Sequence, residues 1–344
     1  MSLTDAVAIF GDRIGRNCVE ISTDPTCLDR EGWWAVTQTF EGQFVAYRFA
    51  EIAHYVPEPS GSFTAVPREL WTSSMSQQRY EAAVASIRDD IARGWVYQAN
   101  LCRVLSAHLD QPIDGLAFWQ RLCELNPAPH AGYLFVPEHD GQPRVEIMCA
   151  SPELFLSRDG SRLMSSPIKG TAPTRELLLD KDSSENIMIV DLVRNDMSHV
   201  ATPGSVNVED LLRLEEHPGL VHLVSDVVGE LRDGLSWTEI LQGLTPPGSV
   251  SGAPKSSALE VINRLEPVAR GIYCGAFGWV DADSVGASLA VGIRTFWQEV
   301  HEGFTTLSFG TGAGITWGSD PAHEWRETEL KANHLLNIAA HVTK

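Results

Sequence analysis

Two predicted helices carry carboxylates spaced so that they share a helix face. Near the end of the chain, Glu324 and Glu327 are three residues apart and Lys331 is four further on, which places all three on one face. On an earlier helix, Asp182 and Glu185 are also three apart. Because Mg²⁺ is often held by one or two carboxylates together with substrate oxygens, two such faces opposite each other would suit magnesium. Solvated surface charges remain the alternative, since this spacing is common.

A lysine between residues that shape the backbone is the second feature. The segment Pro167-Ile168-Lys169-Gly170-Thr171 follows a predicted strand. Gly170 permits an unusual backbone, and a Gly–Thr pair offers N–H groups and a hydroxyl to an anion. A lysine held in a pocket can lose its proton and become a nucleophile. The alternative is a surface loop lysine.

Two further polar residues lie in apolar surroundings. Arg294 ends an apolar predicted strand, ASLAVGIRTF, so it either pairs with a core carboxylate or points at an anionic ligand. His222, in LVHLVSD, is expected on an apolar helix, where a structural histidine is the alternative to a functional one. Cys274 and Ser249 have no evident His/Asp partner motif, so nucleophilic hydrolase chemistry is not indicated.

The glycine-rich segments do not predict a nucleotide site. Gly310, Gly312 and Gly314 follow a predicted strand and suggest a close backbone approach to a ligand, but Ile315 stands where G-x-G-x-x-G needs its third glycine. The segment GSVSGAPKS resembles a P-loop only superficially, because its spacing is wrong and Pro254 precedes the lysine.

The elements that must position these residues are short antiparallel strands and helices. GYLFVP with RVEIMCA, and ELFLSR with RLMSSPI, form predicted hairpins. Helices are predicted over 75–94, 183–197 and 210–231, and after Asp320-Pro321, where Asp320 is the N-cap. Strand-like runs also include GIYCGAFGWV and TTLSFGTGAGI. Without a regular βαβ order, this pattern predicts an α+β fold.

Composition limits the partners and the location. The net charge of −19 and the lack of a basic stripe argue against nucleic-acid binding. We expect no membrane association, since no run approaches about 20 apolar residues. The start of the chain lacks a secretion signal and the six cysteines are scattered, so we expect a cytoplasmic protein with reduced thiols. The chain is expected to be a single domain, 1–344, with a strand-rich part at 1–76, a core at 77–344 and a linker-like segment at 57–67.

Read in order, the segments resemble the chorismate-utilising enzymes from about Gln77 to Asn333. The matching segments are YQANL, ASPE, PIKGT, ENIMIVDLVRND, GSVSGAPKS, GIYCGAFGW, AVGIRT, GTGAGIT and SDP with the glutamates that follow it. The resemblance implies an α+β fold of two stacked antiparallel sheets with helices packed outside, and an active site in a cleft.

Within that family, Lys169 is the discriminating residue. Members that aminate chorismate at C4, the aminodeoxychorismate synthases, carry PIKGT as here, whereas anthranilate and isochorismate synthases typically have alanine at the lysine position. Isochorismate- and salicylate-forming members place a lysine at the position of Gln98. The resemblance therefore implies amination of chorismate at C4, for 4-aminobenzoate and folate synthesis.

The resemblance also implies roles for individual residues. Mg²⁺ would be held by Glu185 and Glu327, with Glu324 and Asp182 acting through water. Arg294, Tyr273 and Gly312 would bind the enolpyruvyl carboxylate, and Gly170, Thr171 and Lys331 would lie along the ring carboxylate and the metal. Lys169 would attack C2, Glu153 would protonate the departing hydroxyl and His222 would assist it.

Ammonia would come from glutamine through a partner amidotransferase subunit, because no such domain is recognisable in this chain. The part before the resemblance is short for the family, which leaves a regulatory tryptophan site open. The alternatives are an anthranilate synthase component I, a chorismate-binding subunit without catalysis and a nucleotide-binding protein.

Overall fold

The structure, a computed structural model, describes residues 2–57, 61–172, 174–178, 180–217, 220–301 and 303–342. Their α-helices are α1 (Gln77–Ala92), α2 (Gly115–Leu125), α3 (Asp180–Ser198), α4 (Trp237–Leu244), α5 (Lys255–Leu265) and α6 (Pro321–Ala339). Their strands are β1 (Val7–Phe10), β2 (Arg13–Ser22), β3 (Trp33–Gln38), β4 (Phe44–His54), β5 (Trp71–Ser73), β6 (Gln98–Leu109), β7 (His130–Val136), β8 (Val145–Ser151), β9 (Leu154–Asp159), β10 (Arg162–Ser166), β11 (Ile168–Ala172), β12 (Asn207–His217), β13 (Leu220–Glu230), β14 (Gly252–Ala253), β15 (Ala276–Asp281), β16 (Gly286–Val291), β17 (Thr295–His301) and β18 (Phe304–Ile315).

Antiparallel ladders join these strands into one network, which confirms the expected α+β class. Starting from β6, the pairings run β6–β18–β17–β8–β7–β1–β2–β4 and continue β4–β3–β15–β16–β9–β10–β13. The strands β11 and β12 pair with β13 at one end, and β5 and β14 pair with β6 at the other. The two sheets that we expected are therefore continuous through hydrogen bonds.

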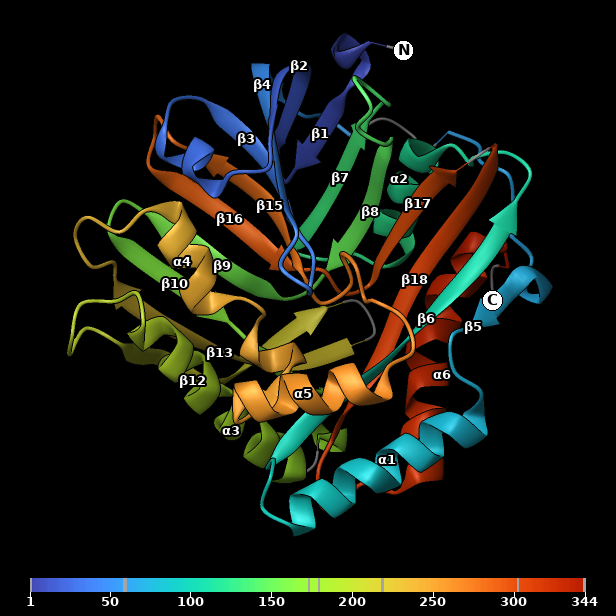
Figure 1. Ribbon diagram of the computed structural model, residues 1–344, viewed down its shortest axis with the longest axis vertical. Helices are drawn as coiled ribbons and strands as arrows, with labels where there is room; N and C mark the ends of the chain where they lie inside the picture. The colour runs from blue at the N-terminus through green and yellow to red at the C-terminus, as the bar shows by residue number, and fades with distance from the viewer. Residues whose placement is uncertain are drawn as a thin grey trace.

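The helices pack against this network through apolar faces. Figure 1 shows α1 beside α6, and α3 beside β12 and β13. In α6, Leu335 and Leu336 are buried in one cluster with Phe118 of α2 and with Phe296 and Phe309 of the sheet. Most of the stability of α6 comes from such tertiary packing of one face rather than from helix propensity. The opposite face of the helix is free to carry polar side chains.

Several predicted elements are confirmed. Both central hairpins form, as β7 with β8 and β9 with β10. The helix predicted over 183–197 lies within α3, and the helix predicted over 75–94 contains α1. The last helix begins as expected, since the Asp320 side chain accepts a hydrogen bond from the His323 N–H at 2.9 Å.

The helix predicted over 210–231 is wrong, because this region forms the hairpin β12–β13. His222 consequently lies on a strand, and the apolar residues on either side of it, Val221 and Leu223, are also buried. Apolar runs of this length fit a buried strand as well as a helix, and pairing with β10 and β11 decides the outcome.

Two other predicted strands are shorter than expected. The run ending at Arg294 is divided into β16 and β17, and Arg294 lies in the turn between them with φ +50°. In GIYCGAFGWV, the strand starts only at Ala276. In the linker-like segment, Phe63 and Val66 are buried, and the Val66 N–H donates to the Ala339 carbonyl at 2.8 Å. That segment is therefore packed onto the end of α6.

Candidate active site

Lys169 lies on β11, at an irregularity in its pairing with β13. The register shifts between Ile168 and Thr171, and Gly170 takes φ +84° there, a conformation that favours glycine. The regular partner positions resume at Thr171, which is opposite His222. His222 is buried, with 1% of its surface exposed. The side chain of Thr171 lies outside the described residues.

Asn186 of α3 fixes the backbone of this irregular segment. Its Nδ2 donates to the Leu223 carbonyl at 3.0 Å and to the Lys169 carbonyl at 3.5 Å, and its Oδ1 accepts from the Ser225 hydroxyl at 2.6 Å. Asn186 is fully buried. This anchor also holds the neighbouring Glu185 at the start of α3, beside the segment that carries Lys169.

The amine of Lys169 points at β18, so the two ends of the strand network meet here. A Cβ atom on Gly314 would lie 3.5 Å from Lys169 Nζ and 2.6 Å from Gln98 Nε2. A side chain at position 314 would therefore clash with Gln98, whereas the Lys169 amine would only come into ordinary contact with it. Gln98 is 2% exposed, and its Oε1 has no hydrogen-bond partner among the described residues.

The surroundings of Lys169 favour its neutral form. Burial lowers the pKa of Lys169, and the positive charge of Lys331 lowers it further, while Glu153, Glu185 and Glu327 act in the opposite direction. A lysine whose pKa is lowered by desolvation has a larger nucleophilic fraction at neutral pH. These four charged residues come from α3, α6 and the link between β8 and β9, so the fold brings five of the predicted site residues together, counting Lys169 itself.

Glu153 is suited to donate a proton. It follows β8 and is 4% exposed. Burial raises the pKa of Glu153 to about 7, even though a hydrogen bond from Ser249 and the charge of Lys169 oppose the rise. A general acid works best when its pKa lies near the operating pH, so a substantial fraction of Glu153 can donate at neutrality.

The helix α6 contributes the predicted polar face. Lys331 Nζ lies 2.7 Å from Glu327 Oε1 and donates to the Gly312 carbonyl at 3.1 Å. Glu324 is 9% exposed, and burial raises the pKa of its carboxyl, with the nearby charge of Glu327 adding to the effect. The predicted sharing of one face by these residues is consistent with these contacts.

The carboxylates of α6 and of Glu185 on α3 are oxygen donors of the type that Mg²⁺ prefers. Glu185 and Glu327 both act on the same Lys169 amine, and carboxylates on two helices are the oxygen ligands that this ion takes together with substrate oxygens. Among the residues that the structure describes, no three His, Cys, Asp or Glu side chains are gathered closely enough to hold a metal. The side chain of Asp182 lies outside them. The donor chemistry fits magnesium, with further oxygens required from substrate or water.

Arg294 and Tyr273 lie on neighbouring turns. Burial lowers the pKa of Arg294, and no ion pair joins it to a carboxylate within the described part of the chain. The Tyr273 ring packs directly on Gly310, where a Cβ would come within 2.0 Å of its Cγ. Gly312 is equally restricted, by Cys102 Sγ at 2.5 Å. Gly310, Gly312 and Gly314 lie within β18 and not after a strand, as the sequence pattern suggested.

A buried ion pair that the sequence analysis did not identify supports these segments. Arg270 is 1% exposed and binds both carboxylate oxygens of Glu266, at 2.8 and 2.7 Å. Its other N–H groups donate to the carbonyls of Val250 and Asn100, at 2.8 and 2.9 Å. The Tyr273 N–H donates to the Arg270 carbonyl at 3.2 Å. The four-residue spacing of Glu266 and Arg270 is a local signal for the ion pair. The contacts of Arg270 with Val250 and Asn100 come from remote segments and carry no local signal.

A family model described as chorismate binding enzyme matches residues 33–337. The chain belongs to this family. Two curated chorismate-binding relatives are similar over most of the chain. Aminodeoxychorismate synthase component 1 of Bacillus subtilis is 34% identical over 80% of this chain and 57% of its own length. Anthranilate synthase component 1 of Streptomyces coelicolor is 37% identical over 77% of this chain and 52% of its own length. The chain thus spans about half the length of these relatives.

Solved structures of the same family share the fold. A putative 2,3-dihydroxybenzoate-specific isochorismate synthase from Bacillus anthracis has a TM-score of 0.81 at 21% identity, covering 99% of this chain and 97% of its own. Anthranilate synthase component I from Streptococcus pneumoniae has a TM-score of 0.74 at 21% identity, covering 96% of this chain and 89% of its own.

Among the described residues no helix is long and apolar enough to span a membrane.

Proposed function

We propose that this chorismate-binding chain is the chorismate-converting component of an aminodeoxychorismate synthase. It would use ammonia to replace the C4 hydroxyl of chorismate, giving 4-amino-4-deoxychorismate for 4-aminobenzoate and folate synthesis in the cytoplasm. Ammonia would be released from glutamine by a partner amidotransferase, as the component 1 names of the relatives suggest. The observation that supports the proposal is that burial lowers the pKa of Lys169 while the charges of Glu153, Glu185 and Glu327 act on the same amine.

Lys169 explains how nitrogen reaches C4. Its neutral amine attacks C2, the two conjugated ring double bonds shift toward C4, and the C4–O bond breaks. Glu153 gives its proton to the departing hydroxyl, which leaves as water, and His222 assists there. Ammonia then attacks C4, and the reverse shift releases the lysine amine from C2. Two such displacements put nitrogen where the hydroxyl was.

The other residues bind and orient the substrate. The Arg294 guanidinium, the Tyr273 hydroxyl and the Gly312 backbone would hold the enolpyruvyl carboxylate, and Gly170, Thr171 and Lys331 would lie along the ring carboxylate. Glu185 and Glu327 would hold Mg²⁺, with Glu324 and Asp182 acting through water. When bound, the metal would supply a Lewis acid that anchors and polarises the ring carboxylate.

The test is to incubate the pure chain with chorismate, Mg²⁺ and ammonium and to identify the products by mass spectrometry. We expect 4-amino-4-deoxychorismate, which an added lyase converts to 4-aminobenzoate. Formation of anthranilate would instead support the anthranilate synthase alternative. Absence of turnover, even with an amidotransferase subunit and glutamine, would leave a chorismate-binding subunit without catalysis.

A further inference from the structure

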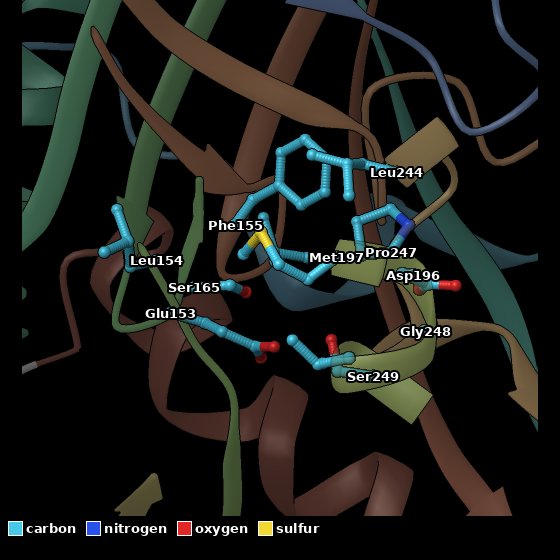
Figure 2. A pocket seen from close by; sticks show the side chains of 12 residues that line it. Glu153, Leu154, Phe155, Ser165, Asp196, Met197, Leu244, Pro247, Gly248 and Ser249 are labelled. Atoms are coloured by element: carbon cyan, nitrogen blue, oxygen red, sulfur yellow. The ribbon is translucent and has the colours of Figure 1, made fainter. Parts of the chain in front are cut away.

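A small cavity lies on one side of the Glu153 carboxyl. It is lined by Glu153, Ser165, Ser249 and Asp196 and by apolar side chains that include Val193. Figure 2 shows the side chains of Glu153 and Ser249 extending toward each other across it. About 20 Å³ of the cavity can hold the centre of a water molecule, which is room for roughly one water.

Ser249 comes from a short 3-10 helix, Gly248–Val250, that is held at both sides. The Asn100 amide donates to the Ser249 carbonyl at 2.8 Å. The preceding Gly248 packs against the Asp196 carboxylate, since a Cβ atom there would lie 3.0 Å from Asp196 Oδ2, and Asp196 is paired with Lys255 at 2.8 Å. The Ser249 hydroxyl, on a residue that is 4% exposed, thus faces the Glu153 carboxyl across the cavity, where it favours the carboxylate form.

Two other charged groups lie near Glu153, and neither takes over the role of the Ser249 hydroxyl. Lys169 of β11 acts on Glu153 from the side of the proposed substrate. Asp196 of α3 shares the cavity, but its charge is already paired with Lys255 of α5. When Glu153 gives up its proton, a carboxylate forms in a mostly apolar space, where a buried charge is costly unless it accepts hydrogen bonds.

We propose that Ser249 and a single water in this cavity are the positioning groups that stabilise the carboxylate of Glu153 during proton transfer. The inference rests on the proposed function in that Glu153 protonates a leaving hydroxyl. The proton balance closes within one turnover. Glu153 loses a proton to the hydroxyl that leaves C4 as water, and it regains the proton that the new C4 ammonium releases on becoming an amine.

The experiment compares Ser249→Ala with Val193→Ile, which fills the cavity, and with Ser308→Ala. Ser308 is a buried serine bonded to the Ser106 hydroxyl at 3.2 Å, away from this cavity, and serves as the control. The full chain is assayed for chorismate consumption across a pH series. Loss of the Ser249 donor makes Glu153 a weaker acid. In Ser249→Ala, the alkaline limb of the pH profile of kcat/KM should therefore move to higher pH, and kcat/KM should fall roughly tenfold.

Val193→Ile should move the alkaline limb in the same direction, and Ser308→Ala should leave it in place. An unchanged limb in Ser249→Ala, or an equal shift in the control, would overturn the inference. Chorismate consumption is followed rather than product identity, so a wrong assignment of the aminated carbon does not affect the result.

If the wild-type chain consumes no chorismate, the proposed function fails while this inference can still be tested. Infrared spectra then follow the protonated carboxyl band of Glu153, assigned by its loss in Glu153→Gln. The band should persist to higher pH in Ser249→Ala than in the wild type, and identical titration would contradict the role of Ser249.

Discussion

Replacing Glu153 by glutamine should stabilise the protein at high pH while removing its activity. The pKa of Glu153 is raised from 4.5 to about 7 by burial, so between these values the folded chain binds more protons than the unfolded chain. Stability therefore falls as pH rises through this window. Each pKa unit corresponds to about 1.4 kcal/mol. Relative to a side chain that does not titrate, Glu153 thus destabilises the fold by about 3 kcal/mol at pH 8, where it is ionised. At pH 5, where the folded chain keeps it protonated, the cost is only about 1 kcal/mol.

The free energy of unfolding would be measured by urea denaturation at both pH values. Glu153→Gln should be more stable than wild type by about 2–3 kcal/mol at pH 8 and by much less at pH 5. Glu138→Gln, at an exposed loop position, is the matched control and should stay within about 0.5 kcal/mol of wild type. A Glu153→Gln variant with the same gain at both pH values, or with none, would refute the assignment of a buried acid whose charge is unfavourable.

Two other substitutions test the binding and support of the site. Arg294→Met should raise the KM for chorismate by roughly two orders of magnitude with little change in the melting temperature, because a half-buried cation without a protein carboxylate would no longer bind the substrate anion. An unchanged KM would show that Arg294 does not bind substrate. Arg270→Met should destabilise the chain by about 3–5 kcal/mol, since it leaves Glu266 buried and unpaired. Urea denaturation measures this, and a loss below about 1 kcal/mol would contradict the inferred importance of the pair.

The sequence predicted the parts of the fold that depend on local signals. Asp320 and Pro321 specify the start of α6 directly, and Asp159-Gly160 marks the turn between β9 and β10. The region around His222 was misassigned because a buried strand and a buried helix both present an unbroken apolar run. Pairing with β10 and β11, which are distant in the chain, selects the strand, and no local pattern contains that information.

The candidate site likewise combines features that local spacing predicts with features that only tertiary contacts provide. Spacing on one helix face was enough to group Glu324, Glu327 and Lys331. The approach of Lys169 to Gly314 depends on the two ends of the strand network meeting, which only the tertiary structure provides. Ser249 lacks a His/Asp motif, and it faces Glu153, about a hundred positions away in sequence, only in the tertiary structure. A polar residue whose partner comes from a remote element carries no signal in its own sequence.

The central claim is that Lys169 directs nitrogen to C4, and the products of Lys169→Ala test it most directly. Wild type and variant would be incubated with chorismate, Mg²⁺ and ammonium, and the aminated products separated and identified by mass spectrometry. We predict that the wild type makes 4-amino-4-deoxychorismate and that Lys169→Ala loses this product, with any remaining amination at C2. Unchanged formation of the 4-amino product by Lys169→Ala would contradict the claim.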